Sequence, residues 1–358
     1  MLAGPPTGNR GDSDFRGDAR IAPALFRPRR VFKSQTPLTS AAFRWKVPRM
    51  LAYIARRLLW TPFLLIFVSL FVFTLGLYGP GDPVEVRLGQ NYTPERAERL
   101  RDQLGLNDSF FTQYVRYVSN ALKGDFGESL RFQGQKVTQI LGPKIWVSVQ
   151  LNVIAFAISL GVGLPLGFYV AKRQGSWQDP VVVFTALVLY ALPVFITAPF
   201  LVWIFALELH WVPTAGWGGF LDKRIILPAV VIGIPGIAVF VRLMRASTLD
   251  ILGQDYIRTA RAKGLSEFTV NARHTGRNAL LPIVTVTFFS LAGLLGGALV
   301  VELIFGVPGV GRLSLEAITA RDYNVVMALT IMGATALVVA NLLMDIAYTV
   351  VDPRIRLQ

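Results

Sequence analysis

The chain has 358 residues, of which 53% are hydrophobic and 16% are charged, and its mean hydropathy is +0.49. Soluble domains carry about 25% charged residues, so this composition excludes an ordinary soluble domain and indicates a membrane protein. The chain has no cysteine and only two histidines, His210 and His274, which excludes disulfides, thiolate nucleophiles and a histidine cluster for a metal.

Six apolar segments are long enough to cross a bilayer, which takes about 20 residues. The first is too long and too far from the N-terminus for a signal peptide, so we interpret it as an uncleaved span. The predicted fold is therefore all-α and integral to the membrane. The six predicted transmembrane helices cover residues 58–78, 145–170, 180–206, 225–241, 283–301 and 325–350.

The charges of the connecting segments predict the orientation. If the N-terminus is cytoplasmic, the inner segments hold 23 basic and 8 acidic residues, and the outer loops hold 13 of each. Because Lys and Arg are enriched in cytoplasmic loops, both termini are predicted to be cytoplasmic. The net charge of +14 then reflects topology, and we expect no nucleic-acid partner. The inner segments are 1–57, 171–179, 242–282 and 351–358, and the outer ones are 79–144, 207–224 and 302–324.

The N-terminal segment 1–49 is rich in Gly, Pro, Arg and Ser and has no apolar period. We expect it to be a disordered basic extension on the cytoplasmic side. Met50 directly precedes the basic flank of the first span and is an alternative start of the chain. A mobile tail is the simpler interpretation, and a role at the membrane surface is the alternative. Residues 50–358 form the predicted transmembrane domain.

The outer loop 79–144 is predicted to contain two short helices. The first has Thr93 as N-cap, Pro94 at the first helical position and Gly105 as its stop. The second runs from about Ser109 to Lys123, and Gly124 ends it. We expect a small helical cap on the outer mouth, either a packed lid or a docking point for an outside partner. Apolar residues with helical spacing in the second helix are Phe111, Tyr114, Val115, Val118 and Leu122.

The inner loop 242–282 contains the sequence DYIRTARAKGLS. Asp255 is predicted to cap a short helix and Gly264 to end it, because glycine favours the left-handed conformation found after a helix. Ser266 is predicted to cap a second short helix. Two short helices between two spans form an exposed knob. An ordinary solvated basic loop is the alternative.

Small residues and prolines within the spans indicate close helix packing and kinks. Gly293 and Gly297 form a G-x-x-x-G, and Gly161, Gly163 and Gly167 cluster in the second span. Kinks are predicted at Pro165, Pro193, Pro199 and Pro235.

These motifs resemble those of one family of membrane proteins, the inner-membrane permease subunits of peptide-type ABC importers (the dipeptide/oligopeptide permease B family). DYIRTARAKGLS (255–266) followed by RNALLP (277–282) is similar to that family's EAA loop. Arg258 stands where the broader consensus has glutamate, which is typical of the peptide-type subgroup. The resemblance covers roughly residues 50–358. Further matching motifs are RRLL (56–59), GPGDP (79–83), GLNDSFFTQYVRY (105–117), KGDFGESL (123–130), VELIFGVPGVGRL (301–313), ARDYNVV (320–326) and NLLMDIAYTVVDPRIR (341–356).

The resemblance implies a type I ABC importer permease fold and two sites. One is a coupling helix that sits in a cleft of a cytoplasmic ATPase, and the other is an apolar outer mouth. The implied coupling residues are Asp255, Tyr256, Arg258, Thr259, Ala260, Arg261, Ala262, Lys263, Gly264 and Leu265. The implied outer-mouth or gate residues are Phe305, Val307, Pro308, Gly309 and Gly311.

The resemblance also implies the partners: a second homologous permease, two cytoplasmic ABC ATPases and an extracytoplasmic solute-binding protein, in a prokaryotic inner membrane. The chain has no G-x-x-x-x-G-K-[ST], so we expect it to hold no cofactor and to have no catalytic residue, with ATP and Mg bound by the ATPases. Peptide is the leading substrate, and nickel, oligosaccharides and other small solutes stay open.

An ion-coupled secondary transporter is the alternative function. Such carriers keep ionisable groups within the bilayer, and the candidates here are Asp345 in the last span and Glu302 at a boundary. A membrane-embedded enzyme is a weaker alternative, because no nucleophile–base pair or metal set lies in or beside a span.

Overall fold

The protein is helical over the residues that its computed structural model describes. Within this part of the chain, the β structure is one isolated antiparallel bridge between Glu128 and Lys136. Residues 1–46 of the predicted extension 1–49 lie outside the described residues. The first described helix begins at Val47, three residues before the predicted end of the extension. The described ranges are 47–79, 82–132, 134–293 and 296–351.

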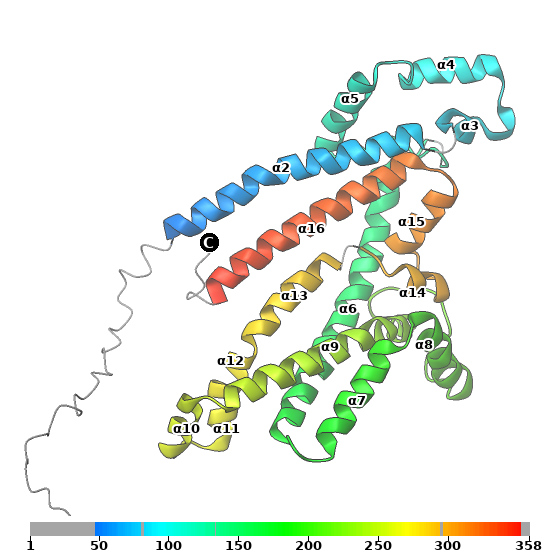
Figure 1. Cartoon of the computed structure of the whole chain (residues 1–358). Coiled ribbons are helices and arrows are strands. Elements are labelled where there is room, and N and C mark those ends of the chain that lie inside the picture. Colours follow the sequence, from blue (N-terminus) through cyan, green and yellow to red (C-terminus); the bar gives the residue numbers. More distant parts are fainter. Residues whose placement is uncertain (1–46, 80–81, 133, 294–295, 352–358) are drawn as a thin grey trace, which may run out of the picture. The chain divides into compact units, whose positions relative to one another are not determined.

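Four long helices are joined by many short ones (Figure 1). The long helices are α2 (Val47–Tyr78), α6 (Val137–Lys172), α9 (Ile226–Leu252) and α16 (Tyr323–Val351). The others are α3 (Pro83–Leu88), η1 (Gly89–Asn91), α4 (Pro94–Leu104), α5 (Phe110–Leu122), α7 (Gln178–Ala191), α8 (Val194–Leu201), η2 (Val202–Glu208), η3 (Lys223–Ile225), α10 (Asp255–Ala262), α11 (Glu267–Thr269), η4 (Val270–Gly276), α12 (Arg277–Ala279), α13 (Leu281–Gly293), α14 (Leu299–Ile304) and α15 (Val310–Thr319).

Four helices in the described part of the chain are long and apolar enough to cross a membrane. A fifth candidate is the pair formed by α7 and the continuous α8–η2 segment, which is bent by 105°. The bend lies at Pro193, one of the predicted kinks, and proline accounts for it because it lacks the backbone N–H that would continue the helix. The four spans are Leu59–Tyr78, Val137–Lys172, Lys223–Leu252 and Tyr323–Met344.

The predicted span 283–301 is not one continuous helix. The helix α13 ends at Gly293, and the next helix, α14, begins at Leu299. Gly297 lies between them with a φ of +70°, and a Cβ on it would come within 2.5 Å of the backbone nitrogen of Gly311. The prediction of a helix-packing pair at Gly293 and Gly297 is therefore wrong, because Gly297 serves a turn in close contact with another backbone segment.

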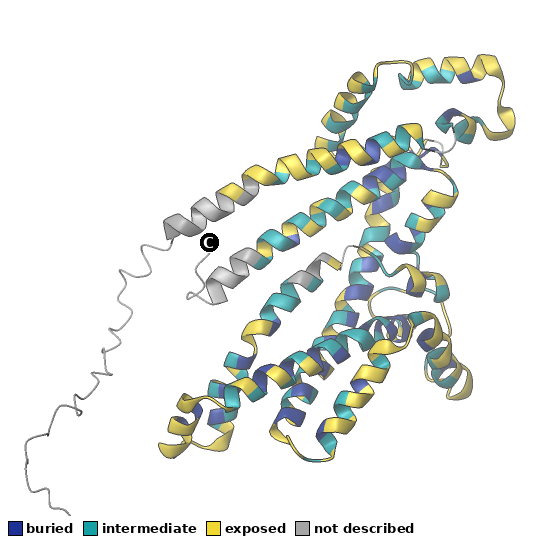
Figure 2. Ribbon diagram, viewed as in Figure 1, coloured by how far each residue is buried: buried dark blue, intermediate teal, exposed yellow. Residues whose placement is uncertain are grey.

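The crossing of α6 and α9 forms the most buried part of the fold (Figure 2). Gly167 of α6 lies so close to α9 that a Cβ on it would come within 2.5 Å of the carbonyl oxygen of Val241, and Gly163 lies similarly close. From the other side, a Cβ on Gly233 of α9 would come within 3.0 Å of the carbonyl oxygen of Ala155 in α6. The predicted close packing is confirmed at these two α6 glycines, whereas Gly161 faces open space.

Replacing Gly167 by Leu is expected to destabilise the protein by about 1–3 kcal/mol, the usual cost of overpacking a tight contact. The matched control is Gly161→Leu, because a Cβ at Gly161 has no neighbour within 4 Å. The thermal unfolding midpoints of the two purified variants in detergent provide the comparison. Equal midpoints would contradict a close α6–α9 contact.

The two predicted helices of the outer loop are confirmed with their caps. The hydroxyl of Thr93 accepts a hydrogen bond from the backbone N–H of Arg96, and Gly105 ends α4 in the left-handed conformation at φ +65°. The hydroxyl of Ser109 accepts from Thr112 at the start of α5. These caps are made by residues within one turn of the helix end, which explains why the sequence predicts them well.

Candidate functional site

In the knob formed by α10 and α11, the first helix, α10, is flanked on both sides by residues with non-helical backbone. Gln254 is the N-cap residue, so the predicted cap at Asp255 is wrong: Asp255 is the first helical residue. A carboxylate there still favours the helix, because it lies beside the free N–H groups of the first turn. At the other end Gly264 has a φ of +74° and donates its N–H to the carbonyl of Arg261 at 2.9 Å. The predicted glycine stop is thus confirmed.

The second half of the knob is held to the first by a cap and an ion pair. The hydroxyl of Ser266 accepts from the backbone N–H of Thr269 at 3.3 Å, as the sequence predicts. The guanidinium of Arg261 contacts the carboxylate of Glu267 at 2.9 Å, joining α10 to α11. Because both side chains are largely exposed, this ion pair orients the turn and contributes little to stability.

One face of α10 is buried against the following helix. Ile257 has no exposed surface and Ala260 is 6% exposed, and both pack against Val270 of η4. The two residues lie three positions apart and thus on the same side of the helix. Burial of this face fixes the opposite face of α10 relative to the long helices.

The opposite face of α10 is exposed and mainly basic. Arg258 lies 3.7 Å from the carboxylate of Asp255, and Lys263 forms no ion pair with any described residue. A compact basic surface with small residues such as Thr259 and Ala262 is suited to contact a complementary surface closely. The implied coupling residues on the exposed surface are Asp255, Tyr256, Arg258, Thr259, Arg261, Ala262, Lys263, Gly264 and Leu265.

The knob is connected to α9 and α13 by the chain and by side-chain contacts. It follows α9 directly, and the hydroxyl of Ser247 in α9 donates to the carbonyl of Ala279 in α12 at 2.8 Å. Ala279 and Ile283 then pack against Phe240 and Met244 of α9. A force on α10 is therefore passed both to α9 and, through η4 and α12, to α13.

An ion pair that the sequence analysis missed joins α7 to the same part of α9. Both carboxylate oxygens of Asp179 accept from the guanidinium of Arg245, at 2.5 and 2.6 Å. Asp179 is buried, and a bidentate pair of this kind fixes orientation as well as distance. The link connects α7, next along the chain from α6, to the helix that carries the knob.

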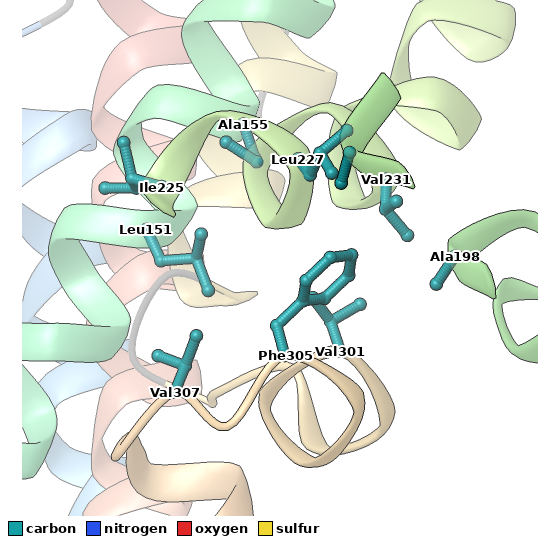
Figure 3. Packing of buried hydrophobic residues seen from close by; sticks show 11 residues of the cluster. Leu151, Ala155, Ala198, Ile225, Leu227, Val231, Val301, Phe305 and Val307 are labelled. Carbon is teal, nitrogen blue, oxygen red and sulfur yellow. The ribbon is translucent and has the colours of Figure 1, made fainter. Parts of the chain in front are cut away.

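The predicted outer-mouth residues lie in the turn between α14 and α15. Phe305 and Val307 are buried in a hydrophobic cluster with Leu151 of α6 and Leu227 of α9 (Figure 3). Pro308 and Gly309 continue the same turn, and Gly311 is the second residue of α15. Within this chain, then, these residues pack the turn against the α6–α9 pair.

Glu302 in α14, the helix before this turn, is fully buried among neutral donors. One carboxylate oxygen accepts from the hydroxyl of Ser148 at 2.7 Å and the N–H of Ala298 at 3.1 Å. The other accepts from the N–H of Arg312 at 2.9 Å. A Cβ on Gly309 would overlap the same carboxylate, so glycine is required there. Glu302 thus holds together α6, α14 and α15. Asp345, the other ionisable group singled out from the sequence, has a side chain outside the described part of the structure.

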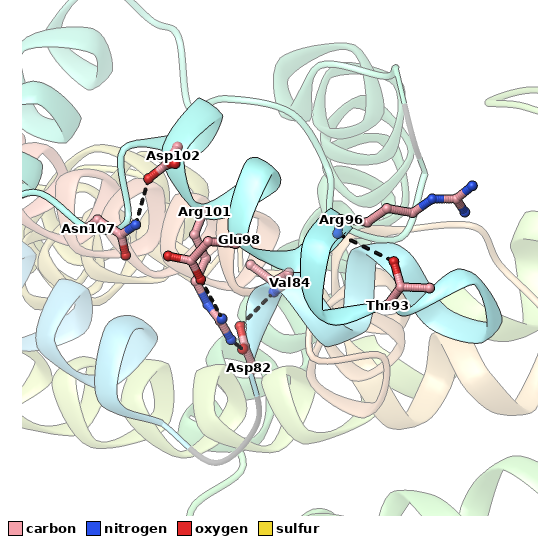
Figure 4. Close-up of polar contacts among 8 residues, drawn as sticks. All are labelled: Asp82, Val84, Thr93, Arg96, Glu98, Arg101, Asp102 and Asn107. Carbon is pink, nitrogen blue, oxygen red and sulfur yellow. Dashed lines mark hydrogen bonds and ion pairs between the residues drawn. The ribbon is translucent and has the colours of Figure 1, made fainter.

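The segment 82–136, which the sequence predicts to lie outside and which is named the outer segment for that reason, is held by a set of local polar contacts (Figure 4). Asp82 caps α3 by accepting from the N–H of Val84 at 2.8 Å, and it also pairs with Arg101 of α4. The hydrogen bond from Arg101 to Asp82 raises the pKa of Arg101 above its ordinary value. Further along, the N–H of Gly127 holds the pKa of Asp125 below its ordinary value.

A second buried carboxylate, Asp322, fixes this outer segment to the start of α16. It accepts hydrogen bonds from the hydroxyl of Ser129 and from the N–H groups of Leu130 and Arg131, at 3.1 and 3.3 Å. It also accepts from the N–H of Val325 in the first turn of α16. Asp322 lies in the motif ARDYNVV (320–326), but the sequence alone indicates no role for it.

Replacing Asp322 by Ala is expected to release the segment around Ser129, because it leaves buried donors without an acceptor at about 1–3 kcal/mol each. Trypsin should then cut at Arg131 much faster than in the unaltered protein. The control is Asp108→Ala, which removes an exposed partner of Arg116. Unchanged cleavage at Arg131 in the Asp322 variant would contradict the anchoring role.

Comparison with known proteins gives matches over nearly the whole chain. Residues 163–357 match the family described as binding-protein-dependent transport system inner membrane component, and residues 50–134 match its N-terminal part. The chain is 37% identical to a probable peptide ABC transporter permease protein of Sinorhizobium fredii, over 85% of this chain and 99% of the relative. It is 36% identical to the oligopeptide transport system permease protein OppB of Haemophilus influenzae, over 86% and 100%. It is 34% identical to the dipeptide transport system permease protein DppB of Alkalihalophilus pseudofirmus, again over 86% and 100%. The chain belongs to the family of binding-protein-dependent transport system inner membrane components.

Proposed function

We propose that this permease component carries peptides as part of an ATP-driven importer. The match over 85–86% of this chain and nearly all of each relative, named as peptide, oligopeptide and dipeptide permeases, supports the substrate class. The proposal depends most on the α10–α11 knob. Its exposed surface lies between α9 and α13 and is fixed by packing, so it is suited to receive force from another protein. Nickel and oligosaccharides are the competing substrates.

The proposed topology has six crossings with both termini in the cytoplasm. The four long helices supply four crossings, and the bent α7–α8–η2 segment supplies another. The remaining crossing is formed by α13 with α12, at the place where the sequence predicts the span 283–301. In this arrangement the knob faces the cytoplasm, and the 82–136 segment and the α14–α15 turn face the outside.

In the proposed mechanism, α10 sits in a cleft of a cytoplasmic ATPase that binds ATP and Mg. Closure of two such ATPases moves the knob. Ile257 and Ala260 transmit this movement because they pack α10 against η4, and the Ser247–Ala279 contact extends it to α9. A second homologous permease supplies the other half of the pathway. A solute-binding protein delivers peptide to the outer end, near the turn that contains Phe305 and Val307.

Affinity purification of the tagged chain from native membranes in mild detergent, followed by mass spectrometry, tests this proposal. We expect two ATPase subunits with Walker A sequences and a second multi-span permease to co-purify. The genes of these subunits then lead to the gene of the solute-binding protein, whose ligand identifies the transported solute. A chain that purifies alone and moves solute in liposomes without ATP would instead support the ion-coupled secondary transporter.

A further inference from the structure

The helix α5 has three distinct faces. Its aromatic face, made by Phe110, Tyr114 and Tyr117, packs against Phe73 of α2. A second face is polar and exposed. The third is an apolar stripe with the i, i+4, i+7, i+11 spacing of one side of a helix, and three of its four residues are exposed, Val118 being partly buried. The polar face consists of Thr112, Arg116, Ser119 and Asn120, and the apolar stripe consists of Phe111, Val115, Val118 and Leu122.

The stripe is strongly exposed. Phe111 is 73% exposed, Val115 is 56% exposed and Leu122 is 84% exposed. A helix packed on one side in water normally shows polar residues on all remaining sides. Here the apolar stripe lies between the packed face and the polar face, as in helices that lie at a membrane interface.

Contacts with α2 place α5 at the depth of the membrane. The ring of Phe110 stacks on Tyr78, the last residue of α2, with ring centroids 6.2 Å apart. One turn further, the hydroxyl of Tyr114 donates to the carbonyl of Ile66 at 3.2 Å and bonds the hydroxyl of Ser69 at 2.9 Å. At 1.5 Å per residue, these partners lie about 14–18 Å from the end of α2. Both partners belong to the candidate span Leu59–Tyr78, so α5 lies against a part of α2 that is apolar enough to enter the bilayer.

The surface of α2 beside this contact is itself exposed and apolar. Ile66, Phe67 and Leu70 are large exposed hydrophobic residues within the candidate span Leu59–Tyr78. The stripe of α5 and this surface belong to two helices in direct contact. Exposed apolar residues on a membrane span are suited to contact lipid, and the stripe of α5 is exposed on a helix that packs against this span.

We propose that α5 is an interfacial helix whose stripe (Phe111, Val115, Val118 and Leu122) is buried among the acyl chains of the leaflet at the end of α2. Its polar face is directed to water and to lipid headgroups. The inference depends on membrane insertion of α2, and the proposed topology identifies the leaflet as the outer one. The helix thereby anchors the outer segment to the bilayer as well as to α2.

Because this chain has no cysteine, a cysteine introduced on α5 is its single thiol and can be labelled before the chain is assembled with its partners. Phe111→Cys and Val115→Cys probe the stripe, and Thr112→Cys and Ser119→Cys are matched controls on the polar face of the same helix. Each variant, in the complete transporter in phosphatidylcholine liposomes, is labelled with an environment-sensitive fluorophore. Two quenchers are then compared: phospholipids with a nitroxide on the acyl chain, and iodide in the water.

We expect the lipid nitroxide to quench the stripe positions and iodide to spare them, with the opposite order at the polar positions. Iodide quenching of the stripe as strong as that of the controls would overturn the proposal in favour of a water-exposed helix. A stripe that neither quencher reaches would overturn it in favour of a partner protein. Since the readout is position and not transport, failure here is separate from failure of the importer assignment.

Discussion

Glu302→Ala is expected to lower the free energy of unfolding by at least about 3 kcal/mol. The substitution removes the acceptor for the hydroxyl of Ser148 and for the N–H groups of Ala298 and Arg312. Each buried donor left without a partner costs about 1–3 kcal/mol. The loss also frees the turn that contains Phe305 and Val307. Thermal unfolding of the purified protein in detergent measures the effect.

Glu302→Gln separates the loss of hydrogen bonds from the loss of volume. Both carboxylate oxygens accept from N–H donors, so the amide nitrogen of glutamine would face one of them and repel it. We therefore expect a destabilisation smaller than that of alanine but clearly measurable. The control is Glu316→Gln, which alters a half-buried pair with Arg312 and leaves the hydrogen bonds of Glu302 in place. An alanine variant as stable as the unaltered protein would show that Glu302 does not hold the turn together.

Gly264→Trp is expected to abolish association with the ATPase while leaving the chain inserted. A Cβ at Gly264 meets no atom within 4 Å, so the new side chain extends into open space beside the exposed face of α10. A non-glycine residue at a positive φ costs about 1–2 kcal/mol, which is too little to unfold most proteins. The bulk therefore acts on the docking surface. The measurement is the amount of ATPase that co-purifies with the tagged chain.

Gly124→Trp is the matched control for this variant. Gly124 has a φ of +77°, close to the +74° of Gly264, and it too has open space around it. The same backbone strain is thus introduced in the outer segment, far along the chain from α10. Full ATPase recovery with Gly124→Trp and none with Gly264→Trp is the predicted outcome. Equal recovery from both would count against docking at α10.

The features that the sequence predicts best depend on neighbouring residues. Thr93 and Gly105 bound α4, and Ser266 caps α11, through contacts within a few positions along the chain. The wrong cap prediction at Asp255 misses by one residue. Gln254 takes the cap position without a side-chain hydrogen bond, so its side chain gives no signal in the sequence. Local chemistry thus fixes that a short helix exists here, although its boundary is fixed only to within one residue.

The features that the sequence does not predict depend on contacts between distant residues. Ser148 and Glu302 are 154 positions apart, and Ser129 and Asp322 are 193 positions apart. Neither serine has a local pattern that reveals its partner. The break in the predicted span 283–301 has the same origin. The hydropathy of residues 283–301 contains no information about the positive φ of Gly297 or its contact with Gly311.

A cross-link from α10 to the ATPase tests the central claim most directly. Thr259→Cys places a single reactive group on the exposed face of α10, and Gln103→Cys places one on the exposed surface of α4 in the outer segment. Both variants are coupled to a photoreactive reagent in native membranes. If α10 docks on the ATPase, residue 259 forms an adduct with a subunit carrying a Walker A sequence, and residue 103 forms no such adduct. No ATPase adduct from residue 259, in membranes where the transporter is assembled, would contradict it.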